Sequence, residues 1–139
     1  MKDLNQVTVI GMGLLGGSVA LAVCHALPGV QVVSYSHRPS TRRKAAELLP
    51  AARVADNITE SVSSADLVIL ATPIRTFESV FEQIADSLHP RCIVTDVGST
   101  KLLPARWAQK KLPAHARYVG SHPIAGSEQR GLDYARDDL

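Results

Sequence analysis

The stretch VIGMGLLGGS, residues 9–18, decides the fold of this 139-residue chain. Three of its glycines, Gly11, Gly13 and Gly16, follow the spacing G-x-G-x-x-G. The stretch comes directly after a strand-like apolar run and opens a helix-like run, and in that context the spacing indicates a dinucleotide-binding turn. Gly11 would permit the tight turn, Gly13 the close approach of a pyrophosphate, and Gly16 the packing of the helix on the strand. A glycine-rich loop without a ligand is the alternative.

The helix that begins in this stretch is expected to contribute to phosphate binding. The first amides of a helix have no partner within the helix, and they carry the positive end of its dipole, so they form a ready anion site. We therefore expect a cofactor to contact the whole turn, which consists of Gly11, Met12, Gly13, Leu14, Leu15 and Gly16.

The rest of the chain continues the alternation of strand and helix. Apolar runs predict strands at residues 6–11, 30–35, 65–73, 91–97 and 117–121, and helical spacing predicts helices at 14–27, 40–49, 77–88 and 101–111. Strands separated by helices imply crossover connections and a parallel sheet covered on both faces. The predicted fold is α/β: a Rossmann-type, doubly wound, mainly parallel sheet in one domain over residues 1–139. The last stretch, LDYARDDL (132–139), is interpreted as the start of a further helix in a chain cut before a second domain.

Composition and charge exclude several function classes. The chain is 45% hydrophobic and 20% charged, and its formal net charge of +2 is too small to indicate a nucleic-acid surface. No apolar run reaches the roughly 18 residues of a membrane span, and the first strand leaves no room for a signal peptide. Cys24 and Cys92 lie far apart and outside any metal-ligand spacing, which favours a reducing compartment. We expect a cytoplasmic protein with no metal, nucleic-acid or membrane partner.

The end of the second strand bears on which dinucleotide is bound. An NAD site normally carries an acidic residue about 20 positions after the glycine turn, to bind the ribose 2′-hydroxyl. Ser36 stands there, and no acidic residue occurs between Asp3 and Glu47. Hydroxyl and cationic donors suit a 2′-phosphate, which a carboxylate would repel. The sequence SHRPSTRRK (36–44) therefore predicts a preference for NADP, with NAD also possible, through Ser36, His37, Arg38 and Thr41. A solvated, charged helix start is the alternative.

Two later strands end in polar residues. The carboxyl ends of parallel strands meet at the edge of the sheet where ligands bind. LATPI (70–74) brings Thr72 and Pro73 to that edge, although Pro73 could simply end its strand. TDVGSTK (95–101) brings Asp96, Gly98, Ser99, Thr100 and Lys101 there. Ser99 could instead cap the next helix, or serve in both roles.

The last strand leads into VGSHPIAGSEQRG (119–131), which contains His122. Four other histidines have ordinary positions in loops, at a helix end or beside the expected phosphate site. His122 alone stands among small residues at a strand exit that should face the nicotinamide end of a cofactor. We therefore interpret His122 as a site residue.

Four stretches together resemble the prephenate/arogenate dehydrogenase family of tyrosine biosynthesis. They are GMGLLGGSVALA, DLVILATPI, VTDVGSTK and GSHPIAGSEQRG, in that order along the chain. Many dehydrogenases share the glycine stretch, whereas DVGSTK together with GSHPIAGSE is much more specific. Many members carry an acidic residue where Ser36 stands, and this chain is similar to those that use NADP.

The resemblance implies an NAD(P)-dependent oxidative decarboxylation of prephenate or arogenate. In members of this family a hydride leaves the ring carbon that bears the hydroxyl, carbon dioxide departs, and the ring becomes aromatic. By motif position His122 would be the general base, and Ser99 would bind the substrate hydroxyl and orient His122. Neutral imidazole suits that proton transfer near neutral pH. The family continues into a helical domain that forms a homodimer and supplies substrate-binding cations, so we expect the present chain to be inactive alone.

Two other interpretations remain open. One is a different NADP-dependent reductase built on the same sheet, of the imine or β-hydroxyacid type. The other is a non-catalytic nucleotide-binding module, which would keep the glycine turn but would not need both Ser99 and His122.

Overall fold

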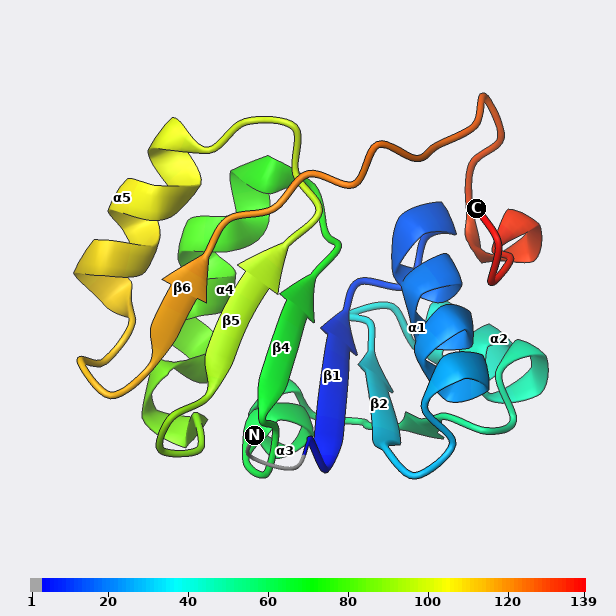
Figure 1. Cartoon of the computed structure of the whole chain (residues 1–139), viewed down its shortest axis with the longest axis horizontal. Coiled ribbons are helices and arrows are strands. Elements are labelled where there is room, and N and C mark those ends of the chain that lie inside the picture. Colours follow the sequence, from blue (N-terminus) through cyan, green and yellow to red (C-terminus); the bar gives the residue numbers. More distant parts are fainter. Residues whose placement is uncertain (1–3) are drawn as a thin grey trace.

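A six-stranded sheet forms the centre of the computed structural model, which describes residues 4–139 (Figure 1). Its strand order is β3-β2-β1-β4-β5-β6, and all five neighbouring pairs are parallel. The strands are β1 (Gln6–Ile10), β2 (Gln31–Tyr35), β3 (Arg53–Val54), β4 (Leu67–Leu70), β5 (Ile93–Asp96) and β6 (Arg117–Val119). This order, with β1 beside β4 at the centre, is that of a doubly wound Rossmann sheet.

Helices cover both faces of the sheet (Figure 1). One face carries α1 (Leu14–Ala26) and α2 (Pro39–Leu48), and the other carries α3 (Ile58–Val62), α4 (Phe77–Ile84) and α5 (Leu102–Lys111). Three short 3-10 helices, η1 (Ile74–Thr76), η2 (Ala85–Ser87) and η3 (Leu132–Tyr134), complete the described elements.

The central strands are apolar on both sides because each helical layer needs its own core. In β4, Val68 and Leu70 face the layer of α3, α4 and α5, whereas Ile69 faces the layer of α1 and α2. All three side chains are buried. A strand buried on both faces is a continuous apolar run, which is why LVIL could be recognised from sequence.

Most of the predicted elements are confirmed, within a few residues at their ends. Two short elements, β3 and α3, were not predicted, because two strand residues and five helical residues are too few to show a periodicity. The helix expected over 132–139 is wrong: only η3 forms there, and Ala135 already has an extended backbone. The amide of Arg136 donates to Ser18 Oγ of α1 (3.0 Å) instead of continuing a helix.

The end of the chain docks on the first helix. After β6 the chain crosses above the carboxyl ends of the strands and reaches α1 on the far side of the sheet (Figure 1). Leu132 is only 4% exposed and fills the space that Gly17 leaves open, since a Cβ on Gly17 would lie 2.3 Å from its Cδ1 atom. An ion pair of Lys44 with Asp133 (2.7 Å) and a hydrogen bond between His25 Nδ1 and Asp137 Oδ2 (2.5 Å) flank this contact. We call residues 132–137 the docked segment.

Some features are absent from residues 4–139. None of the helices there is long and apolar enough to cross a membrane. The same part of the chain has no group of three or more His, Cys, Asp or Glu side chains arranged to hold a metal ion. Cys24 and Cys92 are both free thiols.

Candidate functional site

A cleft of about 1120 Å³ runs along the carboxyl ends of the strands. Its walls come from the turns after β1 and β2, the segments after β4 and β5, and the loop after β6. Thirteen of the sixteen site residues expected from sequence line it: Gly11, Met12, Gly13, Leu15, Ser36, His37, Arg38, Thr41, Thr72, Pro73, Gly98, Ser99 and His122. The volume exceeds that of ordinary small-molecule pockets, which is appropriate for a ligand as long as a dinucleotide.

The glycine turn has the geometry that its spacing predicted. Gly11 has a φ of +101°, and a Cβ there would lie 2.7 Å from the backbone of Ala71 and Thr72. A Cβ on Gly16 would lie 1.8 Å from the Gly11 carbonyl oxygen, so helix α1 can approach β1 only with glycine here. Gly13 differs, because its missing Cβ points into open space in the cleft. Gly11 and Gly16 thus serve packing, and Gly13 leaves room for a ligand.

The N-terminus of α1 is open to an anion. Its N-cap is Gly13, which has no side chain to accept from the first amides, and the first turn contains no acidic residue. The positive end of this 13-residue helix is therefore uncompensated by the protein where it meets the cleft. This geometry fits a diphosphate group, which would accept hydrogen bonds from the amides and neutralise the dipole.

The turn after β2 forms a polar part of the cleft wall. Ser36 is largely buried, and its Oγ accepts from the amide of Arg38 (3.4 Å). The guanidinium of Arg42 stabilises this turn, because it donates to the Ser36 carbonyl (2.8 Å) and forms an ion pair with Asp56 (3.4 Å). Arg42 is therefore engaged in structure, whereas Arg38 and Thr41 line the cleft.

The described lining of the cleft contains arginines but no carboxylates. Arg38 lies in its wall after β2, and Arg75 lies in the segment after β4. No Asp or Glu is among the lining side chains of residues 4–139, so no side chain there repels an additional phosphate. Thr76 holds the segment that carries Arg75. Its single hydroxyl proton can be donated either to Thr72 Oγ1 (2.8 Å) or to the Pro73 carbonyl (2.7 Å).

Asp96 lies beneath the cleft rather than in its wall. Its side chain is fully buried, and its Oδ1 accepts from the amide of Gly98 (2.6 Å) and from Lys101 Nζ. Its Oδ2 accepts from the hydroxyl of Tyr118 (2.5 Å), and its backbone carbonyl accepts from Ser121 Oγ. The direct cofactor contact expected of Asp96 is therefore not available in this arrangement. Leu14 and Gly16 are likewise absent from the cleft lining, and Gly16 is buried against Gly11.

Ser99 and His122 reach the same cleft from neighbouring strand exits. Both are exposed and line it. No hydrogen bond joins the two side chains in the described part of the chain, so the orienting contact expected between them is a prediction for the complex with substrate. The alternative role of Ser99 as a helix cap is wrong: α5 has Lys101 as its N-cap residue and no side-chain cap.

Four residues that shape the site are not predicted from the sequence. Arg75 and Thr76 follow Pro73, and Tyr118 and Ser121 contact Asp96 together with Lys101. Lys101 lies at the edge of the sheet, as the stretch TDVGSTK predicts. Tyr118 could not be found from sequence, because a tyrosine in a strand usually belongs to the core.

Comparisons with known proteins agree with this geometry. A family described as "Prephenate dehydrogenase, nucleotide-binding domain" matches residues 19–139. The prephenate dehydrogenase of Bacillus subtilis is 34% identical over 100% of this chain and 37% of its own length. The cyclohexadienyl dehydrogenase of Zymomonas mobilis is 36% identical over 96% of this chain and 45% of its own length.

A solved structure is similar over the same region. It is the prephenate dehydrogenase from A. aeolicus in complex with hydroxyphenyl propionate and NAD+, with a TM-score of 0.85 and 29% identity. The match covers 97% of this chain and 47% of that one. The present chain thus spans less than half the length of these relatives.

The sheet order, the glycine turn and the open helix N-terminus define a Rossmann-type nucleotide-binding domain. More specifically, the chain belongs to the prephenate dehydrogenase family, in which it corresponds to the nucleotide-binding domain.

Proposed function

We propose that this chain is the NADP-preferring cofactor domain of a dehydrogenase that converts prephenate or arogenate by oxidative decarboxylation. One observation carries the proposal: the glycine turn, the polar turn after β2, Ser99 and His122 all line a single cleft. A protein that only bound nucleotide would not need a histidine and a serine at the far end of that cleft.

The preference for NADP rests on the wall after β2. Where an NAD site places a carboxylate, this chain places Ser36, and Arg38 and Thr41 line the same wall. Arg38 would form a charge-assisted hydrogen bond with a 2′-phosphate. The diphosphate would lie at the N-terminus of α1, in the space that Gly13 leaves open.

The chemistry would take place at the other end of the cleft. The bound nicotinamide supplies a hydride acceptor. The imidazole of His122 accepts the proton of the substrate hydroxyl as the carbon that bears it is oxidised, and the Ser99 hydroxyl hydrogen-bonds the substrate oxygen. Loss of the ring carboxylate as carbon dioxide then leaves an aromatic ring. Both residues are exposed, so substrate can reach them directly.

The remaining requirements of the reaction lie outside this domain. Because the chain spans less than half of its relatives, we propose that a further helical domain supplies substrate-binding cations and forms a homodimer. On this proposal residues 1–139 bind cofactor but turn over substrate poorly by themselves. Two free thiols are consistent with the cytoplasm as the compartment of the protein.

Cofactor titration tests the first part of the proposal. Purified chain is titrated with NADPH and with NADH, and the change in nicotinamide fluorescence gives the two dissociation constants. We expect the constant for NADPH to be lower, and tighter binding of NADH would contradict the assignment of the wall after β2.

A substrate assay tests the second part. The complete subunit that carries this domain is assayed with prephenate and with arogenate, with and without His122→Asn. We expect the substitution to lower kcat by about 10²–10⁴-fold, the usual contribution of a general base. An unchanged rate would remove His122 from the mechanism.

A further inference from the structure

The strongest unexplained feature is the set of partners that converges on Asp96. The side chain of Asp96 is completely buried, yet Asp96 lies only three residues before the exposed Ser99. Removing a carboxylate from water costs several kcal/mol unless charged and polar partners compensate. Asp96 has such partners from both neighbouring strand exits, so its burial needs an explanation beyond packing.

The partners fall into two groups, one for each strand exit. On the side of β5, the carboxylate accepts from the amide of Gly98 (2.6 Å) and from the ammonium of Lys101. On the side of β6, the carboxylate accepts from Tyr118 Oη (2.5 Å), and the Asp96 carbonyl accepts from Ser121 Oγ. Asp96 thus connects Gly98, which precedes Ser99, with Ser121, which precedes His122.

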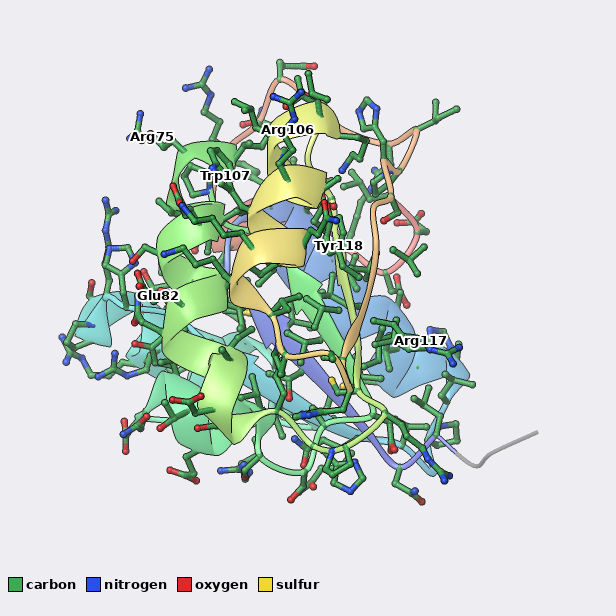
Figure 2. All side chains as sticks on the ribbon, turned by 90° about the vertical axis from the view of Figure 1, so that its left-hand side faces the viewer. Arg75, Glu82, Arg106, Trp107, Arg117 and Tyr118 are labelled. Atoms are coloured by element: carbon green, nitrogen blue, oxygen red, sulfur yellow. The ribbon has the colours of Figure 1, made fainter. Side chains whose placement is uncertain are left out.

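Packing reinforces this connection. A Cβ on Gly98 would lie 2.9 Å from the Asp96 carboxylate, and a Cβ on Gly120 would lie 2.7 Å from the side chain of Lys101. Both strand exits therefore close tightly around the carboxylate. The ring of Tyr118 is held in turn by an edge-on contact with Phe81 (5.6 Å between centroids) and lies beside α5 (Figure 2).

We propose that Asp96 is a positioning residue that fixes the relative placement of Ser99 and His122, with Lys101 and Tyr118 as the donors that hold its carboxylate. This proposal rests on the roles proposed above for Ser99 and His122. Asp96 itself does not contact substrate, since it is buried beneath the cleft.

The protonation of Tyr118 is consistent with this role. Burial, followed by the hydrogen bond to Asp96 and the repulsion of its charge, raises the pKa of Tyr118 above the ordinary value for tyrosine. The hydroxyl therefore remains a neutral donor throughout the physiological range. Lys101 offsets the charge of Asp96 and is itself partly exposed, with 36% of its side chain accessible.

The primary variant is Tyr118→Phe, because it removes one donor and keeps the ring against Phe81. Tyr134→Phe is the matched control, since Tyr134 is half-exposed and lies in η3, away from Asp96. Asp96→Asn is the second variant; it removes the charge but keeps the shape of the side chain.

The first measurement uses the cofactor-free chain. NMR follows the backbone amide of Ser99 and the imidazole protons of His122. We expect Tyr118→Phe and Asp96→Asn to shift the resonances of both residues. Tyr134→Phe should leave them unchanged. Shifts limited to the site of substitution, with Ser99 and His122 unaffected, would overturn the proposal.

The second measurement is a double-substitution cycle in the complete subunit. A misplacement of about 1 Å can cost about a hundredfold in rate, so we expect Tyr118→Phe to lower kcat by roughly tenfold or more while KM changes little. In the His122→Asn background the same substitution should cost much less, because only the placement of Ser99 then remains to be disturbed. Equal losses in both backgrounds would contradict action through His122.

The two proposals can fail separately. If His122→Asn leaves the rate unchanged, the proposed function is wrong. If His122→Asn lowers the rate and Tyr118→Phe adds its own independent loss, the proposed function stands and the positioning role of Asp96 is wrong.

Discussion

At the scale of single residues, two glycines at the start of α1 have different roles: Gly16 is needed for folding and Gly13 for the proposed ligand binding. Gly16 has no space for a side chain because the Gly11 carbonyl lies against it, whereas Gly13 faces the open cleft. The same substitution at the two positions should therefore have different effects.

Gly16→Ala should destabilise the fold, and Gly13→Ala should mainly weaken cofactor binding. A Cβ 1.8 Å from a backbone oxygen forces α1 away from β1, at a cost of about 1–3 kcal/mol or more. At Gly13, an N-cap position with negative φ, alanine should cost at most about 1 kcal/mol of stability. Urea unfolding and NADPH titration of both variants measure these effects, and a Gly13→Ala variant with unchanged affinity would argue against a diphosphate at this turn.

Arg38 should determine affinity for the 2′-phosphate. Arg38→Ala removes a charge-assisted hydrogen bond of about 1.5–3 kcal/mol, so NADPH should bind about tenfold more weakly or worse. NADH, which lacks the phosphate, should bind with little change. The control is Arg43→Ala on the same helix, since Arg43 is exposed and does not line the cleft. Equal losses for both cofactors would show that Arg38 binds a group common to the two.

At the scale of elements, the docked segment joins the end of the chain to the first helix. It covers α1 by placing Leu132 against Gly17, and polar contacts to Ser18, Lys44 and His25 surround this apolar contact. The segment thus fixes the far end of the loop that begins at Ser121 and contains His122.

Leu132→Ala should therefore destabilise the domain, by about 2–3 kcal/mol, the lower part of the range for buried leucines. Ile124→Ala is a matched control on the same stretch of chain, because Ile124 is fully exposed and its loss should change the free energy of unfolding by less than about 0.5 kcal/mol. Urea denaturation measures both. Similar effects at the two positions would mean that the docked segment does not contribute to stability.

The elements also show what sequence could and could not predict. Buried strands such as β4 and the glycine turn were predictable, because period and spacing are local properties. The docked segment was misread as a helix, because LDYARDDL has helical composition while its contacts with α1 come from residues far away in the chain. Asp96 shows the same limit. Its position at the edge of the sheet follows from the local sequence and predicts a cofactor contact, whereas its burial depends on Lys101 and Tyr118, whose contacts the local sequence does not show.

At the scale of the whole molecule, a buried thiol couples global stability to alkaline pH. Cys92 precedes β5 in the core shared by α4 and α5. Burial, and then the charge of Asp66, raises its pKa from 9.0 to about 11. Folded chain thus keeps the thiol protonated at a pH where unfolded chain ionises it.

The contribution of this thiol should be complete below about pH 9 and should be lost as pH rises from 9 toward 11. The free energy of unfolding should therefore fall over this interval, and the slope should be shallower in Cys92→Ala. Urea unfolding at successive pH values, with reductant present, measures the slope independently of the lower overall stability of the variant. Identical slopes for the two proteins would contradict the raised pKa of Cys92.

The path of the chain over the sheet has a thermodynamic consequence for ligand binding. The loop from Ser121 to Leu132 is anchored by Asp96 at one end and by α1 at the other. Fixing the backbone of a free loop removes about 1–2 kcal/mol of conformational entropy per residue. Near the contacts with Asp96 and α1, much of this conformational entropy is already lost when the domain folds, before any ligand binds. A substrate that meets His122 therefore encounters a partly preorganised loop, and more of its contact energy remains available as affinity.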